Sequence, residues 1–438
     1  MATYDLTRSE LNSLLAADHI DPSVRQSIIN YLVSDGSFSG PGHTVKVQES
    51  GFPPLDSHAQ VLLVDSATAT VATDPNLKAI VDIADATLTV TGGNNVLVAT
   101  GSGDDKVIMK NSSGNDVVLT GSGNDTVLGG QGADSIYGGS GNDSLVGGSG
   151  NHQLLAGGSG QDTIRGGNGD FDTITGGGGN DVIHGGNGNH DLIQGGPGND
   201  DIRGGNGDFD TISGGGGNDV IHGGNGNHDL IQGGPGNDDI FGGNGDFDTI
   251  SGGAGNDVIH TGNGNHDLTE GGPGNDKLVG GDGDYDTISG GGGNDTMTAG
   301  GGNHDLVQGD NGNDKLFGGS GDYDTISGGG GNDVLQGGSG AHQLLEGNGG
   351  NDTIIAGTGG DTLTGGSGAD LFKVGQEGND TIQGGSGNHD VVQFDDSSHN
   401  AHIHTHLGVT TVTFTDTGQT IKISSVEELV FTNKTVHL

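Results

Sequence analysis

"GGNGDFDTITGGGGNDVIHGGNGNHDLIQGGPGNDDIR" occupies residues 166–203 and recurs almost unchanged in the next 38 residues. Five such blocks run from 166 to 355 without a gap. Within a block, units of nine residues such as 176–184 alternate with units of ten such as 185–194, so each pair spans 19 residues. Because a constant period over many copies is the signature of a solenoid, we expect one coil of chain for every 19 residues.

The nine-residue unit reads G-G-x-G-x-D-x-U-x, where U is apolar. Its first six residues suit a turn, because Gly accepts positive φ and allows close approach of neighbouring backbones. The last three suit a short strand whose apolar residue points inward, and stacked coils pair as parallel strands about 4.8 Å apart. We therefore predict an all-β fold, a right-handed parallel β-roll (a β-solenoid).

The composition indicates that an apolar core alone does not fold this chain. It has 438 residues, of which 98 are Gly and none is Cys, only 28% are hydrophobic, and the formal net charge is -45. Burial of this small apolar area offsets only part of the entropy cost of ordering the backbone. The absence of Cys excludes disulfides and thiolate metal sites. The negative charge argues against a nucleic-acid partner, and no stretch is long enough for a membrane span.

The repeat itself supplies ligands for a cation. Peptide carbonyls in the turns and one Asp per unit are hard oxygen donors, and calcium takes six to eight of these with loose geometry. Stacked coils place the Asp residues in rows, where like charges repel unless a cation lies between them. We therefore expect many Ca²⁺ ions as cofactors, with folding coupled to binding and the calcium-free chain largely unfolded.

In this nonapeptide the chain resembles the calcium-binding repeats-in-toxin (RTX) family over roughly residues 101–394. The resemblance implies that the Asp of each nine-residue unit binds calcium. In this sequence those residues are Asp143, Asp162, Asp181, Asp200, Asp219, Asp238, Asp257, Asp276, Asp295, Asp314, Asp333 and Asp352. The ten-residue units offer further candidates, Asp172, Asp191, Asp210 and Asp229.

The resemblance also implies a route out of the cell. RTX proteins leave Gram-negative bacteria through type I secretion machinery, which reads an uncleaved C-terminal signal. The C-terminal "SVEELVFTNKTVHL" (425–438) resembles common RTX termini. The N-terminus does not resemble a cleaved secretory signal, because it lacks a basic start and a long apolar run. The expected location is therefore extracellular or on the cell surface of a Gram-negative bacterium.

Four regions are expected along the chain: an N-terminal helical segment (1–38), a linker and β-rich start of the solenoid (39–100), the roll (101–394), and a β-rich C-terminal cap with the candidate secretion signal (395–438). In the first region, Thr7 and Glu10 have capping-box spacing, and Asp21, Pro22 and Gly36 bound a second helix. The helices could pack on each other, on the end of the solenoid or on another subunit. Residues 39–58 are interpreted as the linker, and "HNAHIHTH" (399–406) as a surface loop.

The ten-residue units depart from the family pattern by one extra residue before the Asp. It forms a column in which aromatic residues and His alternate: His152, Phe171, His190, Phe209, His228, Phe247, His266, Tyr285, His304, Tyr323 and His342. Three interpretations stay open: a bulge whose ring covers the thin core or the turn, an exposed ladder for assembly, and a transition-metal site using pairs such as His184 and His190. Gln153 and Gln343 replace the Asp at two positions, where we expect calcium to be missing.

The favoured function is structural. No catalytic motif precedes the repeat in residues 1–100, so we do not expect an enzyme. The outward positions Thr173 and Leu192 alternate from coil to coil and predict apolar ridges, which suggests lateral association. We expect a homo-oligomer or filament that forms an extracellular matrix or surface layer. The alternative is a calcium-dependent adhesin or ice-binding solenoid, although Leu interrupts the Thr row in every second coil.

Overall fold

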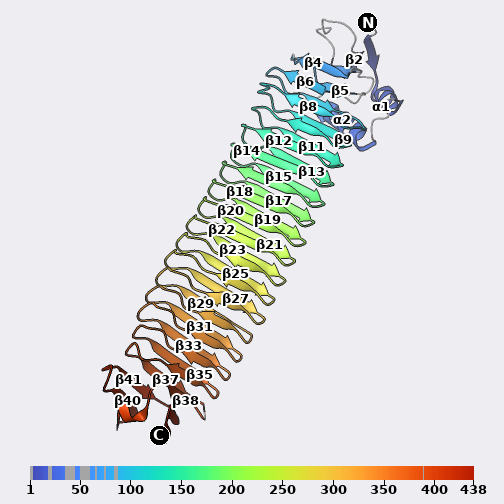
Figure 1. Cartoon of the computed structure of the whole chain (residues 1–438). Helices are drawn as coiled ribbons and strands as arrows, with labels where there is room; N and C mark the ends of the chain where they lie inside the picture. Colours follow the sequence, from blue (N-terminus) through green and yellow to red (C-terminus); the bar gives the residue numbers. More distant parts are fainter. Residues whose placement is uncertain are drawn as a thin grey trace. The chain divides into compact units, whose positions relative to one another are not determined.

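The computed structural model describes residues 3–17, 22–34, 45–49, 60–64, 67–73, 75–82, 87–387 and 389–438. They fall into two compact units, Met1–Gly216 (unit 1) and Gly217–Leu438 (unit 2). In each unit the chain forms coils whose strands alternate between two sheets, here called the first and the second sheet (Figure 1). The predicted all-β parallel β-solenoid is confirmed.

In unit 1 the first sheet contains β1 (Thr3–Leu6), β2 (Val45–Glu49), β3 (Val61–Val64), β5 (Ala79–Asp82), β7 (Leu97–Ala99), β9 (Val117–Ser122), β11 (Ser135–Ser140), β13 (Leu154–Ser159), β15 (Thr173–Gly178), β17 (Leu192–Pro197) and β19 (Thr211–Gly216). Its second sheet contains β4 (Thr68–Ala72), β6 (Thr87–Thr91), β8 (Lys106–Met109), β10 (Thr126–Leu128), β12 (Ser144–Gly148), β14 (Thr163–Gly167), β16 (Val182–Gly186) and β18 (Asp201–Gly205). Neighbouring coils pair in parallel, so Ile174 lies opposite both Leu155 and Ile193. Only β1 is antiparallel to its neighbour β2 among these described strands.

Unit 2 repeats this arrangement. Its first sheet contains β21 (Leu230–Pro235), β23 (Thr249–Ala254), β25 (Leu268–Pro273), β27 (Thr287–Gly292), β29 (Leu306–Gln308), β31 (Thr325–Gly330), β33 (Leu344–Gly349), β35 (Thr362–Ser367) and β37 (Thr381–Gly385). Its second sheet contains β20 (Val220–Gly224), β22 (Asp239–Gly243), β24 (Val258–His260), β26 (Lys277–Val279), β28 (Thr296–Thr298), β30 (Lys315–Phe317), β32 (Val334–Gln336), β34 (Thr353–Ile355), β36 (Leu371–Val374) and β38 (Val391–Phe394). The 19-residue coil predicted from the sequence is therefore the structural repeat.

The core of each repeat coil is thin. One apolar side chain per strand points inward, as Ile164, Ile174 and Ile183 do, and all three are fully buried. The turns require glycine: Gly177 has φ of +114°, and a Cβ added there would clash with the carbonyl oxygen of Gly158 in the preceding coil. Close stacking of the coils and positive φ together explain why glycine stands in fixed register.

Two helices form the N-terminal segment of unit 1, α1 (Arg8–Ala17) and α2 (Pro22–Ser34). The predicted capping box is present: the Glu10 carboxylate accepts hydrogen bonds from the backbone N–H and hydroxyl of Thr7, at 2.8 and 2.7 Å. Pro22 starts α2 as predicted, while Asp21 and Gly36 lie outside the described residues. Strand β2 falls inside the interval interpreted as a linker, whose other residues lie outside the described part.

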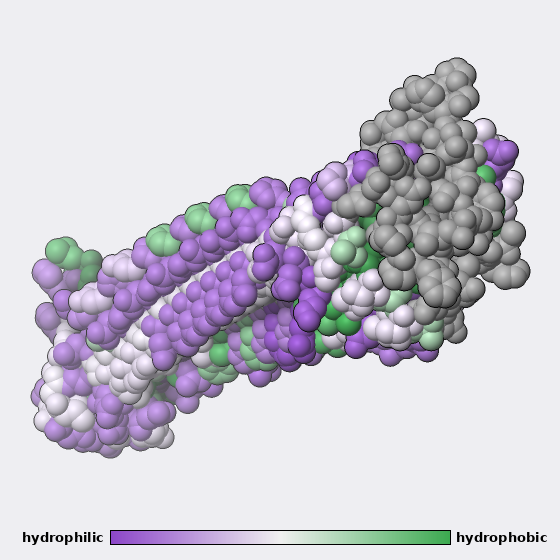
Figure 2. All heavy atoms as spheres, turned by 90° about the horizontal axis from the view of Figure 1, so that it is seen from above, coloured by the Kyte–Doolittle hydropathy of each residue, from purple (hydrophilic) through white to green (hydrophobic). Residues whose placement is uncertain are grey.

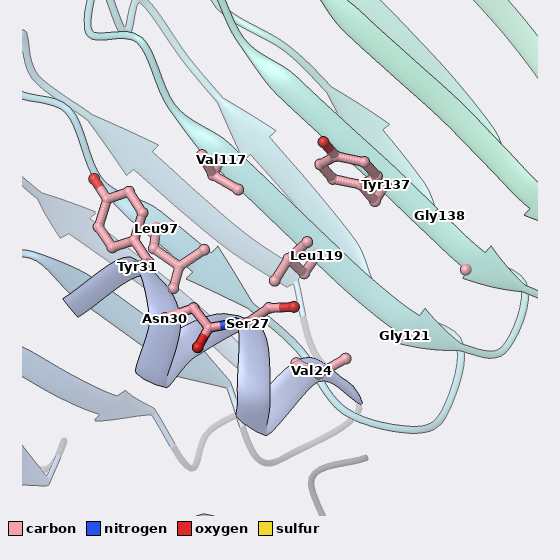
Figure 3. A pocket seen from close by; sticks show the side chains of 11 residues that line it. Val24, Ser27, Asn30, Tyr31, Leu97, Val117, Leu119, Gly121, Tyr137 and Gly138 are labelled. Atoms are coloured by element: carbon pink, nitrogen blue, oxygen red, sulfur yellow. The ribbon is translucent and has the colours of Figure 1, made fainter. Parts of the chain in front are cut away.

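The two helices pack on each other and on the outer face of the first sheet. Their buried residues, including Leu11, Leu15 and Ile28, share one apolar cluster with Val61 and Leu97 of β3 and β7. Figure 3 shows α2 lying beside the strands, where a groove of about 540 Å³ separates Val24 and Tyr31 from Leu119 and Tyr137. No helix among the described residues is long and apolar enough to cross a bilayer.

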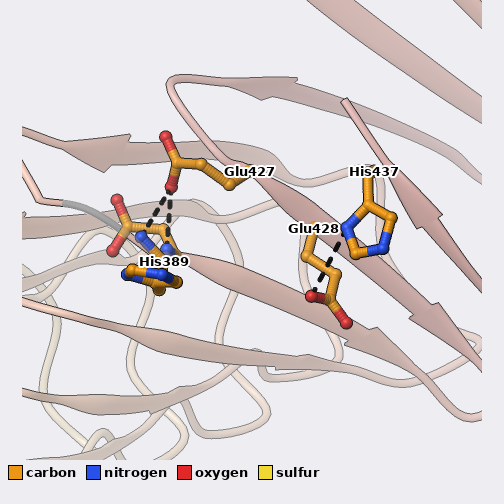
Figure 4. Close-up of polar contacts among 5 residues, drawn as sticks. His389, Glu427, Glu428 and His437 are labelled. Atoms are coloured by element: carbon orange, nitrogen blue, oxygen red, sulfur yellow. Dashed lines mark hydrogen bonds and ion pairs between the residues drawn. The ribbon is translucent and has the colours of Figure 1, made fainter.

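The C-terminal cap of unit 2 extends each sheet by one parallel strand, which is followed by antiparallel pairing. In the first sheet β37 is followed by β41 (Thr420–Ser424), β40 (Val409–Phe414) and β39 (Ala401–His406); in the second, β38 is followed by β42 (Glu428–Phe431) and β43 (Lys434–His437). Phe394, Phe414 and Phe431 pack together between the sheets. Glu427 accepts hydrogen bonds from the backbone N–H groups of His389 and Asp390, as Figure 4 shows for His389.

The prediction of a surface loop at 399–406 is wrong. Residues 398–400 form a short 3-10 helix (Ser398–Asn400), and 401–406 form strand β39, which pairs with β40. The alternation of His402, His404 and His406 with Ile403 and Thr405 follows the two-residue period of a strand, a signal that the polar composition masked. The β-rich character predicted for this segment is nevertheless present.

Candidate calcium sites

In each unit, two rows of buried carboxylates run through the turns. Asp residues of the nine-residue units form the nine-residue row, and those of the ten-residue units form the ten-residue row. All sixteen predicted ligands are buried, with exposed fractions of 1–3%. Neighbouring Asp residues of a row are linked from coil to coil: Oδ1 of Asp162 accepts the backbone N–H of Asp143, and Oδ1 of Asp181 accepts that of Asp162, both at 2.8 Å. The sequence-predicted residues are thus brought together in rows.

In the nine-residue row the second carboxylate oxygen of Asp162 and its neighbours faces a space beside a glycine of the same turn. Oδ2 of Asp143, Asp162 and Asp181 is buried and has no hydrogen-bond partner. A Cβ added to Gly157 would clash with Oδ2 of Asp162 and would lie 2.7 Å from the Gly176 carbonyl oxygen of the next coil. The bare glycine therefore leaves a space between one carboxylate oxygen and one carbonyl oxygen, which suits a cation.

Backbone oxygens must supply most of the remaining ligands. Among the described residues, no group of three or more His, Cys, Asp or Glu side chains is arranged to hold a metal ion. The turn carbonyls of Gly141 and Gly160 do point at the next coil, since a Cβ on Gly160 or Gly179 would clash with them. One carboxylate surrounded by peptide oxygens is a ligand set that matches calcium and disfavours softer metals.

Burial makes the bare carboxylates unfavourable in their ionised form. Loss of solvent raises the pKa of Asp143 to about 7 and that of Asp162 to about 6, although backbone hydrogen bonds from the preceding coil oppose the shift. In unit 2 burial likewise raises the pKa of Asp276 and Asp314 to about 7. A bound divalent cation is the group that keeps such rows ionised at neutral pH.

The extra residue of the ten-residue unit moves the carboxylate. That residue adopts a left-handed conformation, with φ of 60° at His190 and 63° at Phe171. At Gly185, the first glycine of its unit, a Cβ would meet the Gly204 carbonyl and a core Ile but no carboxylate. Oδ2 of Asp191 instead lies 3.1 Å from the Cβ position of Gly188, the fourth residue of the unit. The two rows therefore offer different cation geometries.

Two glutamines interrupt the ten-residue row. Gln343 donates from Nε2 to the Gly321 carbonyl oxygen (3.1 Å) and accepts the N–H of Gly338 at Oε1 (2.9 Å). The Gln343 side chain thus forms a hydrogen bond with the Gly321 carbonyl oxygen, which would otherwise be available to an ion. Gln153 is also buried, but neither atom of its amide has a hydrogen-bond partner. The prediction that calcium is missing at both positions stays a prediction.

In each unit the alternating rings form a half-exposed ladder along the turn edge. Phe171, Phe209 and Phe247 are each 49% exposed, and Tyr285 and Tyr323 are 52% and 55% exposed. Neighbouring rings contact each other: Phe171 stacks between His152 and His190, with centroids 5.1 and 4.9 Å apart. His184 and His190 belong to no metal-binding group in the described part of the chain.

Several buried carboxylates escaped the sequence prediction. They are Asp248, Asp267, Asp286, Asp305 and Asp324 in the ten-residue row, and Asp105, Asp116, Asp125, Asp134, Asp361, Asp370, Asp380 and Asp390 in the more irregular coils. The first group continues the 19-residue period, so the sequence alone would have sufficed to predict these five residues. The second group follows spacings of 18 to 20 residues between coils, seen in hydrogen bonds such as Asp116 to Asp134 and Asp370 to Asp390.

Comparison with known families agrees with this geometry. A family model described as the RTX calcium-binding nonapeptide repeat matches more than half of the chain, at residues 112–145, 119–154, 156–189, 190–208, 194–227, 228–246, 243–265, 270–303, 304–323, 344–372 and 374–388. No curated protein matches the chain. The repeat matches, the β-solenoid and the oxygen-lined rows lead to one conclusion: this chain belongs to the RTX calcium-binding repeat family.

Proposed function

We propose that this is a secreted structural protein whose repeats fold on calcium and whose folded copies associate into an extracellular filament, matrix or surface layer. The observation that carries the proposal is the exposed ring ladder. Coils of constant geometry present the same half-exposed rings at a fixed pitch, and repeated apolar groups on a rigid scaffold favour association with further copies. The RTX solenoid is itself a structural fold.

Secretion through type I machinery, and a place outside a Gram-negative cell, belong to the same proposal. Calcium is abundant outside cells and scarce in the cytosol, so a chain that depends on calcium to fold would stay unfolded until export. The same holds for the four predicted regions (1–38, 39–100, 101–394 and 395–438) and for the sixteen carboxylates as the ligands of many Ca²⁺ ions.

Electron microscopy of the purified protein in millimolar-range calcium, and after chelation, tests the assembly. We expect ordered assemblies in calcium and none after chelation. A variant with Phe247→Ser, Tyr285→Ser and Tyr323→Ser should assemble less while keeping its calcium-dependent circular dichroism. The control carries Leu407→Ser and Val409→Ser, which remove exposed apolar residues in the cap. Wild-type protein that stays monodisperse at high concentration in calcium contradicts the proposal.

The structure offers less support for the adhesin or ice-binding alternative. An ice-binding face needs an unbroken flat row of Thr, but Thr249 and Thr287 alternate with Leu268, which is 47% exposed. Thermal hysteresis measured on the calcium-loaded protein distinguishes the two functions, since we expect none.

A further inference from the structure

The two sheet faces of unit 2 differ in charge. Among the outward residues of its second-sheet strands β20–β36, the charged ones are Lys277, Lys315 and Lys373, all exposed, and a single acid, Asp239. The outward residues of the first-sheet strands β21–β35 include no Lys or Arg. In this sheet the acids are Glu270, Glu346 and, two residues after the end of β29, Asp310. One face is therefore basic and the other acidic, within a chain that is acidic overall.

The opposite charges occur on the same coils. Glu270 in β25 is followed by Lys277 in β26, and Asp310 after β29 is followed by Lys315 in β30. These two coils are separated by one other, because β25 pairs with β27 and β27 with β29. At a strand spacing of about 4.8 Å, Glu270 and Asp310 thus lie about 10 Å apart along the coil axis, and so do Lys277 and Lys315.

These side chains do not pair within the molecule. Glu270 and Lys277 lie on opposite faces of one coil, and neither they nor Lys315 form an ion pair in the described part of the chain. Asp310 accepts a hydrogen bond from the Ser289 hydroxyl, which holds its carboxylate on the first-sheet face. The charges are therefore available to a partner.

Apolar rows accompany the charges on both faces. In the first sheet Leu230, Leu268 and Leu306 recur on alternate coils. In the second sheet the Phe241 ring stacks between His222 and His260, with centroids 4.7 and 5.0 Å apart. Figure 2 shows hydrophobic residues recurring along rows of hydrophilic ones on the face in view. Each face thus combines a partly exposed apolar row with fixed charges, which is the composition of a docking surface.

We propose that the second-sheet face of unit 2 docks on the first-sheet face of unit 2 in another copy of this chain. A sideways translation without any shift along the coil axis places Lys277 at the level of Glu270, and Lys315 at the level of Asp310. Sheets pack face to face about 10 Å apart, a separation that long Lys and Glu side chains span. The charges set the register, while the apolar rows supply buried area.

The contact joins two different faces, so each copy keeps one face free for the next. Such a heterologous contact does not close and extends into an open array. It is distinct from the ring ladder, which runs along the turn edge. The docking rests on the proposed function, because it names a second contact, beside the ring ladder, through which calcium-folded copies associate.

Charge reversal tests the docking. The base-reversed variant carries Lys277→Glu and Lys315→Glu, and the acid-reversed variant carries Glu270→Lys and Asp310→Lys. Each alone presents two faces of like charge, so we expect its association in saturating calcium to weaken about tenfold or more. An equimolar mixture should restore association to the wild-type level, since every contact again joins opposite charges. Sedimentation velocity over a concentration series measures all three samples.

Controls separate charge complementarity from net charge and from misfolding. A variant with Lys422→Glu and Lys434→Glu changes the net charge by the same amount as the base-reversed variant, but in strands β41 and β43 of the cap, and should associate like wild type. Circular dichroism with calcium checks that each variant folds. If wild type associates and the reversed variants match it, or if mixing restores nothing, the docking is overturned while the proposed function stands. Wild type that stays monomeric in calcium overturns both.

Discussion

Unit 1 contains two kinds of coil with the same strand arrangement and different sources of stability. In β3, β5 and β7 consecutive residues are buried, as Val61, Leu62 and Leu63 are, because α1 and α2 cover the outer face of the sheet. In β15 and β17 buried residues alternate with more exposed ones, so Ile174 and Ile193 are fully buried while the residues beside them are partly or fully exposed. Apolar cover stabilises the first kind of coil, and we propose that cations bridging the carboxylate rows stabilise the second.

Chelation of calcium is expected to have the largest effect on this difference. Without a cation the buried carboxylates of residues 129–216 lose their counter-charge, so these coils should unfold. The helix-covered coils around β3, β5 and β7 should keep much of their structure. Hydrogen exchange read by mass spectrometry, with and without chelator, measures both regions at once. Equal loss of hydrogen-exchange protection in the two regions would show that the two kinds of coil do not differ in their dependence on calcium. Protection of the repeat coils that survives chelation would contradict the coupling of folding to calcium.

Truncation of one core side chain in each kind of coil is expected to have the second-largest effect. Ile80→Ala in β5 and Ile164→Ala in β14 remove the same group from fully buried positions, each at a cost of about 2–5 kcal/mol. We expect Ile80→Ala to destabilise its region with or without calcium. Ile164→Ala should instead raise the calcium concentration needed to fold the repeat coils. Calcium titrations followed by circular dichroism provide the midpoints, and identical behaviour of the two variants would contradict the distinction.

Substitution of single carboxylates compares the two rows. Asp181→Asn removes a charge from the nine-residue row, where Oδ2 is buried without a partner, and should lower the bound calcium and cost about 1–3 kcal/mol. Asp191→Asn makes the same change in the ten-residue row, where the carboxylate is displaced by the bulge at His190, and should have the smaller effect. Equilibrium dialysis with metal analysis counts the ions. A larger loss in Asp191→Asn would show that the ten-residue row is the principal calcium row.

Loss of a helix cap is expected to have the smallest effect, confined to the helix-covered region. Thr7→Ala removes the hydroxyl that pairs with Glu10 at the start of α1, at a cost of about 0.5–2 kcal/mol. Hydrogen exchange in α1 should rise, and the number of bound calcium ions should not change. A change in the calcium count would mean that the helices and the repeat coils fold as one cooperative unit.

Residues that follow a local rule were predictable from the sequence. The capping box at Thr7, the 19-residue coil, the inward Ile174 and Ile183 and the buried Asp rows all follow from spacing and from backbone preferences. The displaced carboxylate of Asp191 was not predictable in detail, because it depends on how one left-handed residue turns the chain beside it. Strand β39 was missed because its polar alternation concealed the strand period.

The sequence by itself determined the coil period, the residues that face inward and the rows of Asp residues, because period and glycine placement constrain the backbone locally. Only the tertiary structure decided that α1 and α2 cover the first sheet, that the Phe171 and His190 rings stack at an exposed edge, and that Glu270 and Lys277 lie on opposite faces of one coil. These outcomes depend on which distant surfaces meet, and contacts between residues far apart in the chain leave no fixed spacing in the sequence.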